Sequence, residues 1–176
     1  HNYDGIHLLD WQNKVETGSL QLTKAAIFDI TSYDKNIFVA TGEGAILKVD
    51  RKLLSVAQRV QVSEKSARTM AINEHRGELA VGYSDHFIRI FDLDDLKLKH
   101  GWQAHANSVF TLQYTPDKKF LLSGSRDARL KLWDASTNYV QAAEVVAHMY
   151  AINNIAFSRD SKHFVTCSMD KSIKVW

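Results

Sequence analysis

The sequence is poor in several features, and each shortage narrows what the protein can be. It has one cysteine, Cys167, so an intrachain disulfide is impossible. No apolar run approaches the ~18 residues that a membrane-spanning helix needs, and we expect no membrane association. The net charge is only +2, which gives no reason to expect nucleic-acid binding. A single cysteine fits a reducing compartment, so a cytoplasmic location is expected.

What the chain does have is an ordinary globular composition. Its 176 residues are 45% hydrophobic and 24% charged, which suffices for one domain with a buried core. No signal peptide is recognisable. Because the first residue is His1 rather than methionine, we expect the natural start to lie upstream.

A segment of about ten residues recurs with a period of about 42 residues. The copies are 41–50, 83–92, 125–134 and 168–176, with a weaker copy at 3–10. Within each period apolar and polar residues alternate, which indicates half-buried strands. Gly124, Ser125 and Asp127 are assigned to one intervening turn and Pro116 to another. The unit is therefore predicted to be four short antiparallel strands, and the fold class to be all-β.

The last two copies carry a recognisable signature. Ala104-His105 is followed by Ser125-Arg126-Asp127 and Trp133-Asp134, and Ala147-His148 by Ser168-Met169-Asp170 and Trp176. This pattern resembles the WD40-repeat β-propeller family, with Ala-His in place of the family's Gly-His. The resemblance covers essentially the whole chain, strongly in these two units and elsewhere by register and apolar pattern. It implies blades of four antiparallel strands around a central channel.

The resemblance also implies a division of residues 1–176 into blades of a single propeller segment. The expected parts are a half-blade at 1–22, full blades at about 25–62, 67–103 and 108–146, and an incomplete blade at 151–176. A seven-bladed ring of such units needs about 294 residues. We therefore expect about four repeats that form an incomplete arc of such a ring. An open arc exposes strand edges, so the segment alone is expected to self-associate.

Two sets of residues look at first like a Ser-His-Asp triad. They are His105, Ser123, Asp127 and Trp133 in one unit and His148, Thr166, Asp170 and Trp176 in the next. Because a catalytic triad is rarely duplicated at a fixed period, no catalytic residue is assigned and the protein is expected not to be an enzyme. The resemblance implies structural tetrads instead, in which hydroxyl and imidazole relay a hydrogen bond from a buried indole N–H. Another unit has Val81 and Phe91 beside a retained Asp85, which indicates support for the fold rather than function.

Metal and cofactor sites are not indicated by the sequence. The turn residues Asp4, Asp85, Asp127 and Asp170 give one carboxylate per turn, too few for calcium. The eight histidines show no zinc spacing, and Cys167 is expected to be a small buried hydrophobe. There is no glycine-rich phosphate loop. We therefore expect no metal and no cofactor.

Basic residues alternate with apolar ones in several predicted strands, as at Arg89, Arg129, Lys131 and Lys174. Such spacing places them on one face of a strand. A solvated face, or salt bridges between blades, explains this better than a nucleic-acid stripe. Nucleic acid is therefore not an expected partner.

Loops on a rigid scaffold usually carry binding residues. The resemblance implies docking on the narrower, top face of a propeller, formed by the loop before each first strand and by the turn between the second and third strands. Carried over by register, the candidate partner-binding residues are Ser108, Phe110, Arg126, Arg68, Ser84, Asn153 and Met169. Tyr150 and Met149, beside His148, are weaker candidates on the same face. Aromatic, Arg and Met side chains are enriched in interfaces, and two arginines on one rim favour an acidic peptide or a phosphorylated ligand.

The leading hypothesis is a non-catalytic scaffold that docks other proteins or peptides through this top face. The alternative is a reader of a modified or acidic peptide tail or of nucleic acid, which would need an aromatic cage or a basic stripe. A propeller enzyme would need carboxylates or histidines that converge outside the tetrads. The residues favour the scaffold, although fold alone does not prove function.

Overall fold

The computed structural model describes residues 5–176, and the chain forms two compact units, 1–67 and 68–176. The first unit has a two-stranded sheet, β1 (Gly5–Asp10) and β2 (Val15–Gln21). Its four-stranded sheet contains β3 (Ile27–Tyr33), β4 (Asn36–Thr41), β5 (Ala45–Asp50) and β6 (Ser55–Gln61). Asp4 and the start of the weak copy at 3–10 lie outside the described residues.

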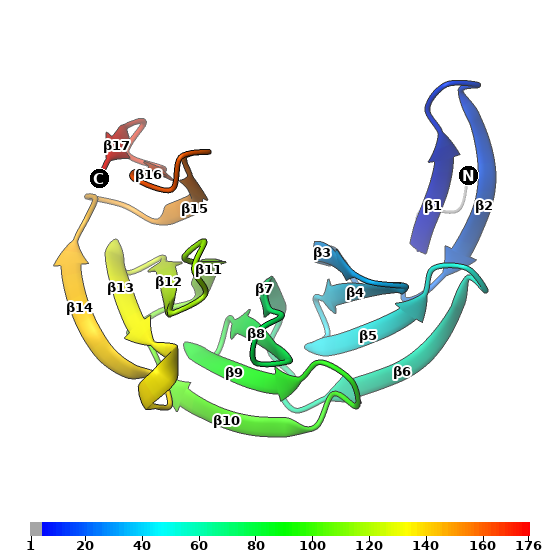
Figure 1. The fold of residues 1–176 in the computed structure, drawn as a ribbon, viewed down its shortest axis with the longest axis horizontal. Coiled ribbons are helices and arrows are strands. Elements are labelled where there is room, and N and C mark those ends of the chain that lie inside the picture. The colour runs from blue at the N-terminus through cyan, green and yellow to red at the C-terminus, as the bar shows by residue number, and fades with distance from the viewer. Residues whose placement is uncertain (1–4) are drawn as a thin grey trace. The chain divides into compact units, whose positions relative to one another are not determined.

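The second unit contains three further sheets (Figure 1). The first contains β7 (Ala67–Asn73), β8 (Glu78–Tyr83), β9 (Phe87–Asp92) and β10 (Leu98–Gln103). The second contains β11 (Val109–Tyr114), β12 (Phe120–Ser125), β13 (Arg129–Asp134) and β14 (Val140–Val146), with a 3-10 turn η1 (Ala135–Thr137) between the last two. The third contains β15 (Ile152–Phe157), β16 (Phe164–Ser168) and β17 (Ile173–Val175). Strands follow chain order in each sheet and neighbours are antiparallel, so the described residues are all-β, as predicted.

The turns between the second and third strands of the sheets β3–β6, β7–β10, β11–β14 and β15–β17 share one backbone feature. One residue in each turn adopts a positive φ, and these residues are Gly44, His86, Ala128 and Lys171. In the second unit the preceding aspartate accepts a hydrogen bond from the backbone N–H two residues later, as Asp127 does from Arg129 at 3.0 Å. This local bond stabilises a tight turn whose backbone a β-branched residue would strain.

Gly124 lies in strand β12 rather than in the turn to which the sequence pattern assigned it, as does Ser125. A Cβ on Gly124 would lie 2.7 Å from methyl carbons of Ile152 and Thr111. Gly82 occupies the matching position of β8, where a Cβ would lie 2.6 Å from Val109. Both glycines therefore let neighbouring sheets of the second unit pack closely, which is a role in packing rather than in turning.

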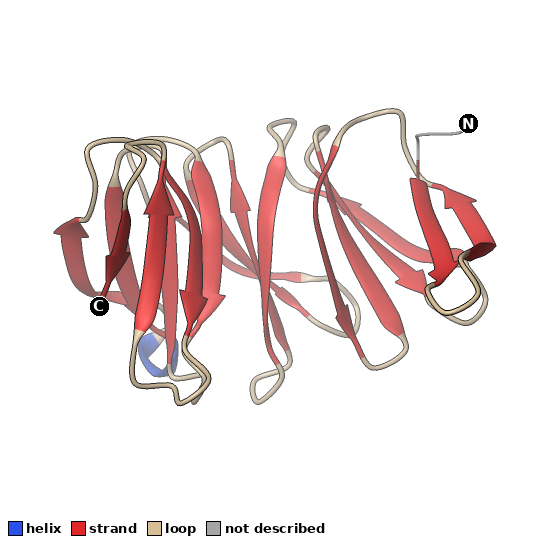
Figure 2. Cartoon of the chain, turned by 90° about the horizontal axis from the view of Figure 1, so that it is seen from above, coloured by secondary structure: helices blue, strands red, loops and turns tan. Residues whose placement is uncertain are grey.

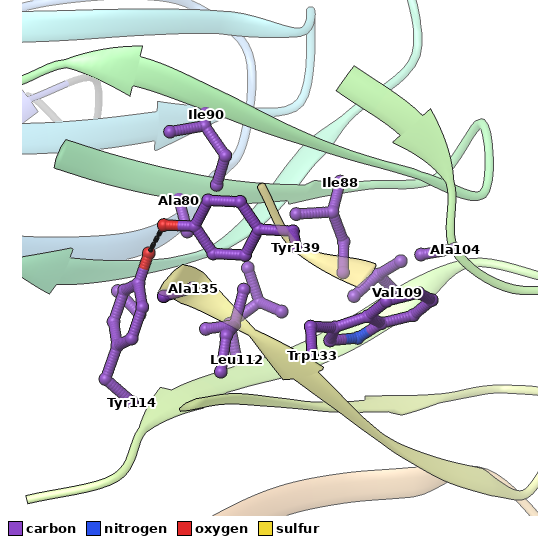
Figure 3. Close-up of a cluster of buried hydrophobic side chains, with 12 residues drawn as sticks. Ala80, Ile88, Ile90, Ala104, Val109, Leu112, Tyr114, Trp133, Ala135 and Tyr139 are labelled. Atoms are coloured by element: carbon purple, nitrogen blue, oxygen red, sulfur yellow. Dashed lines mark hydrogen bonds between the residues drawn. The ribbon is translucent and has the colours of Figure 1, made fainter. Parts of the chain in front are cut away.

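The largest core of the second unit joins its two four-stranded sheets (Figure 3). Trp133 and Tyr139 lie at its centre, and both are almost fully buried. The hydroxyl oxygens of Tyr114 and Tyr139 are 2.5 Å apart, and the Tyr139 hydroxyl donates to Glu78 at 2.7 Å. Burial raises the pKa of Tyr114 well above its usual value. These hydroxyls therefore act as neutral hydrogen-bonding groups that fix the core in one arrangement.

The strands of the second unit run between two sets of loops (Figure 2). One set, called the tetrad end below, comprises residues 104–108, 126–128, 147–151 and 169–172. The other set, called the opposite end, comprises 115–119, 135–139 and 158–163 and includes η1, the helical turn in Figure 2. The candidate binding residues Phe110, Arg126, Tyr150 and Met169 all lie in or beside loops of the tetrad end.

Candidate functional site

The first tetrad is a continuous chain of hydrogen bonds. The indole Nε1–H of Trp133 donates to Ser123 Oγ at 2.8 Å, and Ser123 Oγ lies 2.8 Å from His105 Nε2. His105 Nδ1 lies 3.0 Å from Asp127 Oδ2. Every donor and acceptor is matched when Ser123 donates to Nε2 and Nδ1–H donates to the carboxylate. The structure thus brings together all four residues that the sequence grouped.

The second tetrad repeats this geometry and adds one residue. Trp176 Nε1 donates to Thr166 Oγ1 at 3.0 Å, His148 Nε2 lies 2.8 Å from the same oxygen, and His148 Nδ1 lies 2.9 Å from Asp170 Oδ2. Ser172 joins the set, with its Oγ 3.1 Å from His148 Nδ1. The repeat does not predict this hydroxyl, because the matching position of the first tetrad is Arg129.

Each tetrad carboxylate also holds the backbone of the tetrad end. Burial alone would raise the pKa of Asp127, but hydrogen bonds from His105 and from the amides of Arg129 and Ala106 lower it below its usual value. Asp170 Oδ2 accepts a hydrogen bond from the backbone N–H of Met149 at 3.1 Å. The tetrads therefore fix the residue that follows each histidine.

The sheet β7–β10 has a different polar arrangement at the same place. Asp85 pairs with Arg89 at 2.8 Å, and the Arg89 guanidinium lies over the rings of Tyr83 and Phe87 at 4.6 and 4.9 Å from their centroids. An Arg–Asp pair stacked on aromatic rings thus replaces the His–Asp contact. The signal that could have found it is the spacing of Asp85 and Arg89, four residues apart across the turn.

The tetrad end contains a hollow of about 390 Å³. It is lined by side chains of Phe110, Arg126, Met149, Tyr150 and Met169, together with Asp127, Ala128 and Ala151. Met149, Tyr150 and Met169 are 85%, 62% and 63% exposed. Three large side chains this exposed around one concavity are unusual on a soluble surface and typical of an interaction site. We call it the tetrad-end hollow.

Hydrogen bonds to backbone atoms hold the loop that forms one wall of the hollow. Ser168 Oγ donates to the carbonyl of Tyr150 at 3.1 Å, and the Met169 N–H donates to the carbonyl of Ala151 at 3.1 Å. Together with the bond from Met149 N–H to Asp170, these contacts fix the loop 147–151 while its side chains stay exposed. A surface whose backbone is already ordered loses less entropy when a partner binds.

Phe110 owes its direction to an irregularity of strand β11. The pairing with β12 skips Phe110, between Val109 and Thr111, and forms a β-bulge there. Bulges re-aim side chains, and this one turns the Phe110 ring toward the hollow. The guanidinium carbon of Arg68 lies over the Phe110 ring, 4.6 Å from the ring centroid.

The candidate residues from the sequence divide into three groups in the structure. Phe110, Arg126, Met169 and Tyr150 line the hollow, and Arg68 contacts it through Phe110. Ser108 lies beside it, since its hydroxyl donates to the carbonyl of Ser84 at 3.3 Å and its carbonyl accepts from Arg126 N–H.

Asn153 is not part of the hollow. It occupies the β-bulge of β15, between Ile152 and Asn154, and is exposed. Met149, only a weak candidate from the sequence, is the most exposed residue of the hollow instead. The alternation of side chains does not reveal how far a loop residue projects, so no sequence signal distinguishes these two positions.

Three of the four strand-borne basic residues form ion pairs close to their own strand. Arg129 and Lys131 of β13 both pair with Glu144 of the neighbouring strand β14, and Arg89 pairs with Asp85. Lys174 is exposed, which agrees with the solvated face that the sequence predicts as one alternative. The pairs to Glu144 lie within one sheet and not between blades, because antiparallel register places Lys131 opposite Glu144.

Among residues 5–176, no group of three or more His, Cys, Asp or Glu side chains is placed to hold a metal ion. No helix in the same range is long and apolar enough to cross a membrane.

A family model described as "WD domain, G-beta repeat" matches residues 96–134 and 140–176. Actin-interacting protein 1 of Drosophila melanogaster is 29% identical over 181 aligned positions, which cover 97% of this chain and 29% of the relative. Polyadenylation factor subunit 2 of Candida albicans is 35% identical over 74 residues, covering 42% of this chain and 13% of the relative. The chain thus spans less than a third of these relatives.

Two solved structures share the fold. A chain in a structure titled "Crystal Structure of Mitotic Checkpoint Complex" matches 98% of this chain with a TM-score of 0.88 and 19% identity. A chain in "Structure of U3-55K" matches 89% with a TM-score of 0.80 and 22% identity. This chain covers 54% and 50% of those two chains. At these identities the likeness concerns the arrangement of strands and not the ligands.

Proposed function

Because this chain belongs to the WD40-repeat proteins, we propose that it is a non-catalytic docking platform that binds protein partners at the tetrad-end hollow. The observation that carries the proposal is the hollow itself. Phe110, Met149, Tyr150 and Met169 present apolar surface around one concavity, next to Arg126. Aromatic, methionine and arginine side chains are the types that concentrate at the centres of protein interfaces.

The relatives support protein partners. Two relatives are named for a protein partner or an assembly: an actin-interacting protein and a subunit of a polyadenylation factor. Those partners belong to those proteins. What carries over to this chain is the class of ligand, a protein surface or peptide.

The tetrads support a non-catalytic role. The side chains of His105 and His148 are 0% exposed, and Ser123 and Thr166 are fully buried. Each hydroxyl already accepts from a tryptophan, and each imidazole already contacts an aspartate. A nucleophile must reach its substrate, and these hydroxyls have no open approach.

Site-specific photo-cross-linking tests the proposal directly. A benzoylphenylalanine is placed at Tyr150 or Met169 in the natural full-length protein inside cells. Matched control positions are Val140 and Lys119, which are exposed at the opposite end of the sheet β11–β14. Light should cross-link partner proteins at 150 and 169, and mass spectrometry should identify the same partners from both positions.

Control positions should give only weak, unrelated cross-links. If positions 119 and 140 capture the partners and positions 150 and 169 do not, docking takes place elsewhere and the proposal is wrong. Circular dichroism of each purified variant shows that the cross-linker has not disturbed the strands.

A further inference from the structure

The three methionines of the chain are Met70, Met149 and Met169, and they differ in exposure. Met70 belongs to strand β7 and is only 6% exposed. Met149 and Met169 are mostly exposed, and both line the tetrad-end hollow. Exposure decides how readily a dissolved oxidant reaches a methionine side chain. Both methionines that an oxidant can reach from solvent therefore belong to the proposed docking surface.

The backbone at both exposed methionines is held in place independently of their side chains. The N–H of Met149 donates to Asp170 Oδ2, and the N–H of Met169 donates to the carbonyl of Ala151, each at 3.1 Å. Because these bonds use backbone atoms, a chemical change at either sulfur leaves them intact. With so much of each side chain in solvent, the change also opens no cavity in the core. Oxidation therefore alters the surface of the hollow and not the fold.

Oxidation of a methionine sulfur by a peroxide is a two-electron reaction. A lone pair of the sulfur attacks one oxygen of the peroxide, so that an S–O bond forms while the O–O bond breaks. With hydrogen peroxide, the departing hydroxide takes the proton from the transferred oxygen and becomes water. The sulfur is oxidised to the sulfoxide and the peroxide is reduced. The product carries a polar S=O group where a soft, apolar sulfur stood.

A sulfoxide in the hollow disfavours the burial of apolar side chains of a partner. Its oxygen binds water, and this water must be removed when a partner covers the hollow. Most of the lining, including Phe110, Ala128 and Ala151, has no N–H or O–H group in its side chains to replace that water. Conversion of methionine into its sulfoxide disrupts methionine-rich interfaces for this reason. Oxidation at both positions therefore weakens docking.

We propose that Met149 and Met169 are reversible oxidation sites through which a peroxide weakens docking at the tetrad-end hollow. The inference rests on the proposed function, because it concerns the regulation of the same hollow. Two thiols reverse the step in a reductase-catalysed reaction, since they remove the sulfoxide oxygen as water, form a disulfide and restore the thioether. Cys167 is the other oxidisable sulfur of the chain and is partly exposed, so the experiment must separate its effect.

Peptide mapping by mass spectrometry tests the selectivity of the reaction. The natural full-length protein is treated with hydrogen peroxide, and the addition of one oxygen to each methionine is followed with time. Met149 and Met169 should be oxidised at least about tenfold faster than Met70, because the fold excludes the oxidant from the buried side chain. Circular dichroism should not change. Equal rates at the three methionines, or loss of the strands before the exposed pair reacts, would overturn the inference.

Affinity capture tests the effect of oxidation on docking. The full-length wild-type bait is oxidised, freed of peroxide and then mixed with cell lysate, so that the partners themselves stay unoxidised. The probe is the set of proteins that the wild type captures and Phe110→Ala/Arg126→Glu does not, which defines the partners of the hollow. Capture of this set should fall at least about fivefold after oxidation. It should recover when methionine sulfoxide reductases A and B and a thiol have reduced the bait.

Matched variants assign the loss of docking to the two methionines. Met149→Leu/Met169→Leu keeps apolar side chains of similar volume but cannot form a sulfoxide, so it should capture equal amounts of partner before and after peroxide. Met70→Leu and Cys167→Ser should lose the partners on oxidation as the wild type does. Loss of partners from oxidised Met149→Leu/Met169→Leu would overturn the inference, because the oxidised group would then lie elsewhere.

The outcomes separate this inference from the proposed function. Partners that depend on Phe110 and Arg126 but bind the oxidised wild type as well as the untreated one would overturn the inference and leave docking at the hollow intact. If no captured protein depends on Phe110 and Arg126, both the inference and the proposed function are wrong.

Discussion

The sheets β7–β10 and β11–β14 have the same strand order, the same tight turn and the same packing glycine, but they differ in the polar groups behind that turn. The sheet β11–β14 has the tetrad of His105, Ser123, Asp127 and Trp133. In β7–β10 the positions of Ser123 and Trp133 are Val81 and Phe91, and Asp85 pairs with Arg89 instead of a histidine. Two unlike sets of contacts thus support one backbone.

Both sheets keep an aspartate in the turn, Asp85 or Asp127. The residue that pairs with this aspartate differs between the sheets, and the tetrad hydroxyl is present in only one of them. A set of hydrogen-bonded polar side chains can be replaced by apolar ones with little loss of stability when every member changes. The loss of stability is large when one member changes alone, because its former partner stays buried without a hydrogen bond. The tetrads therefore support the loops of the tetrad end, and we propose that the exposed side chains of these loops bind the partners. The predictions that follow test this division.

The largest effect is expected from importing one residue of β7–β10 into β11–β14. Ser123→Val leaves the buried indole N–H of Trp133 and Nε2 of His105 without partners. We expect it to lower the free energy of unfolding by about 3 kcal/mol. The double variant Ser123→Val/Trp133→Phe no longer buries an unpaired indole N–H, so its loss should be smaller than the sum of the two single losses. Urea denaturation followed by circular dichroism measures all three, and additive losses would contradict the tetrad as a connected unit.

The next effect concerns the other sheet. Arg89→Met removes the partner of Asp85 while it keeps a long apolar side chain over Tyr83 and Phe87. Because the Arg89 and Asp85 side chains are only 14% and 21% exposed, we expect a loss of about 2 kcal/mol. The control Arg159→Met changes an exposed arginine at the opposite end and should cost less than about 0.5 kcal/mol. Equal effects of the two variants would show that the Arg89–Asp85 pair does not replace the His–Asp contact.

A smaller effect is expected in acid. The pKa of Asp127 in the folded protein lies below its ordinary value of 3.8. Its stabilising contribution is therefore present above that ordinary value and is lost as the pH falls from there through the lower pKa of the folded protein. Asp127→Asn should lower the free energy of unfolding by about 1 kcal/mol at pH 7 and should flatten its decrease below about pH 5. Urea denaturation at a series of pH values checks this prediction. If the free energy of unfolding falls equally with pH in wild type and variant, the ionised Asp127 carboxylate does not stabilise the fold.

The smallest effect should have the opposite sign. Tyr83 is fully buried, and its hydroxyl has no hydrogen-bond partner within residues 5–176. Tyr83→Phe removes this polar atom and keeps the ring under Arg89. Stability should stay the same or rise by up to about 1 kcal/mol. A clear loss in thermal or urea denaturation would mean that the hydroxyl contributes to the fold.

Much of the fold could be predicted from the sequence, because the same strand and turn pattern recurs about every 42 residues. The strands β11–β14 and both tetrads were expected, since the period matches His105 and Ser123 with His148 and Thr166 in the next copy. Gly124 was assigned to the wrong element, because a glycine can mark either a turn or a close approach, and only the position of Ile152 separates the two. The seven-bladed ring, the blade boundaries and self-association stay predictions.

The candidate site could be predicted only in part. Register located Phe110, Arg126 and Met169, but it could not show that Met149 projects into the same concavity or that Asn153 does not. The pairing of Asp85 with Arg89 was missed because alternation gives the face of a side chain and not its partner.

The most direct measurement is quantitative affinity capture with the natural full-length protein, in which Phe110→Ala/Arg126→Glu is compared with Val140→Ala/Lys119→Glu. Both variants change one apolar residue and one charge, the first at the hollow and the second at the opposite end. If the hollow docks partners, mass spectrometry should find them lost from the first variant alone, while both remain folded by circular dichroism. Partners that stay bound to the first variant, or that leave both variants equally, would contradict docking at the tetrad-end hollow.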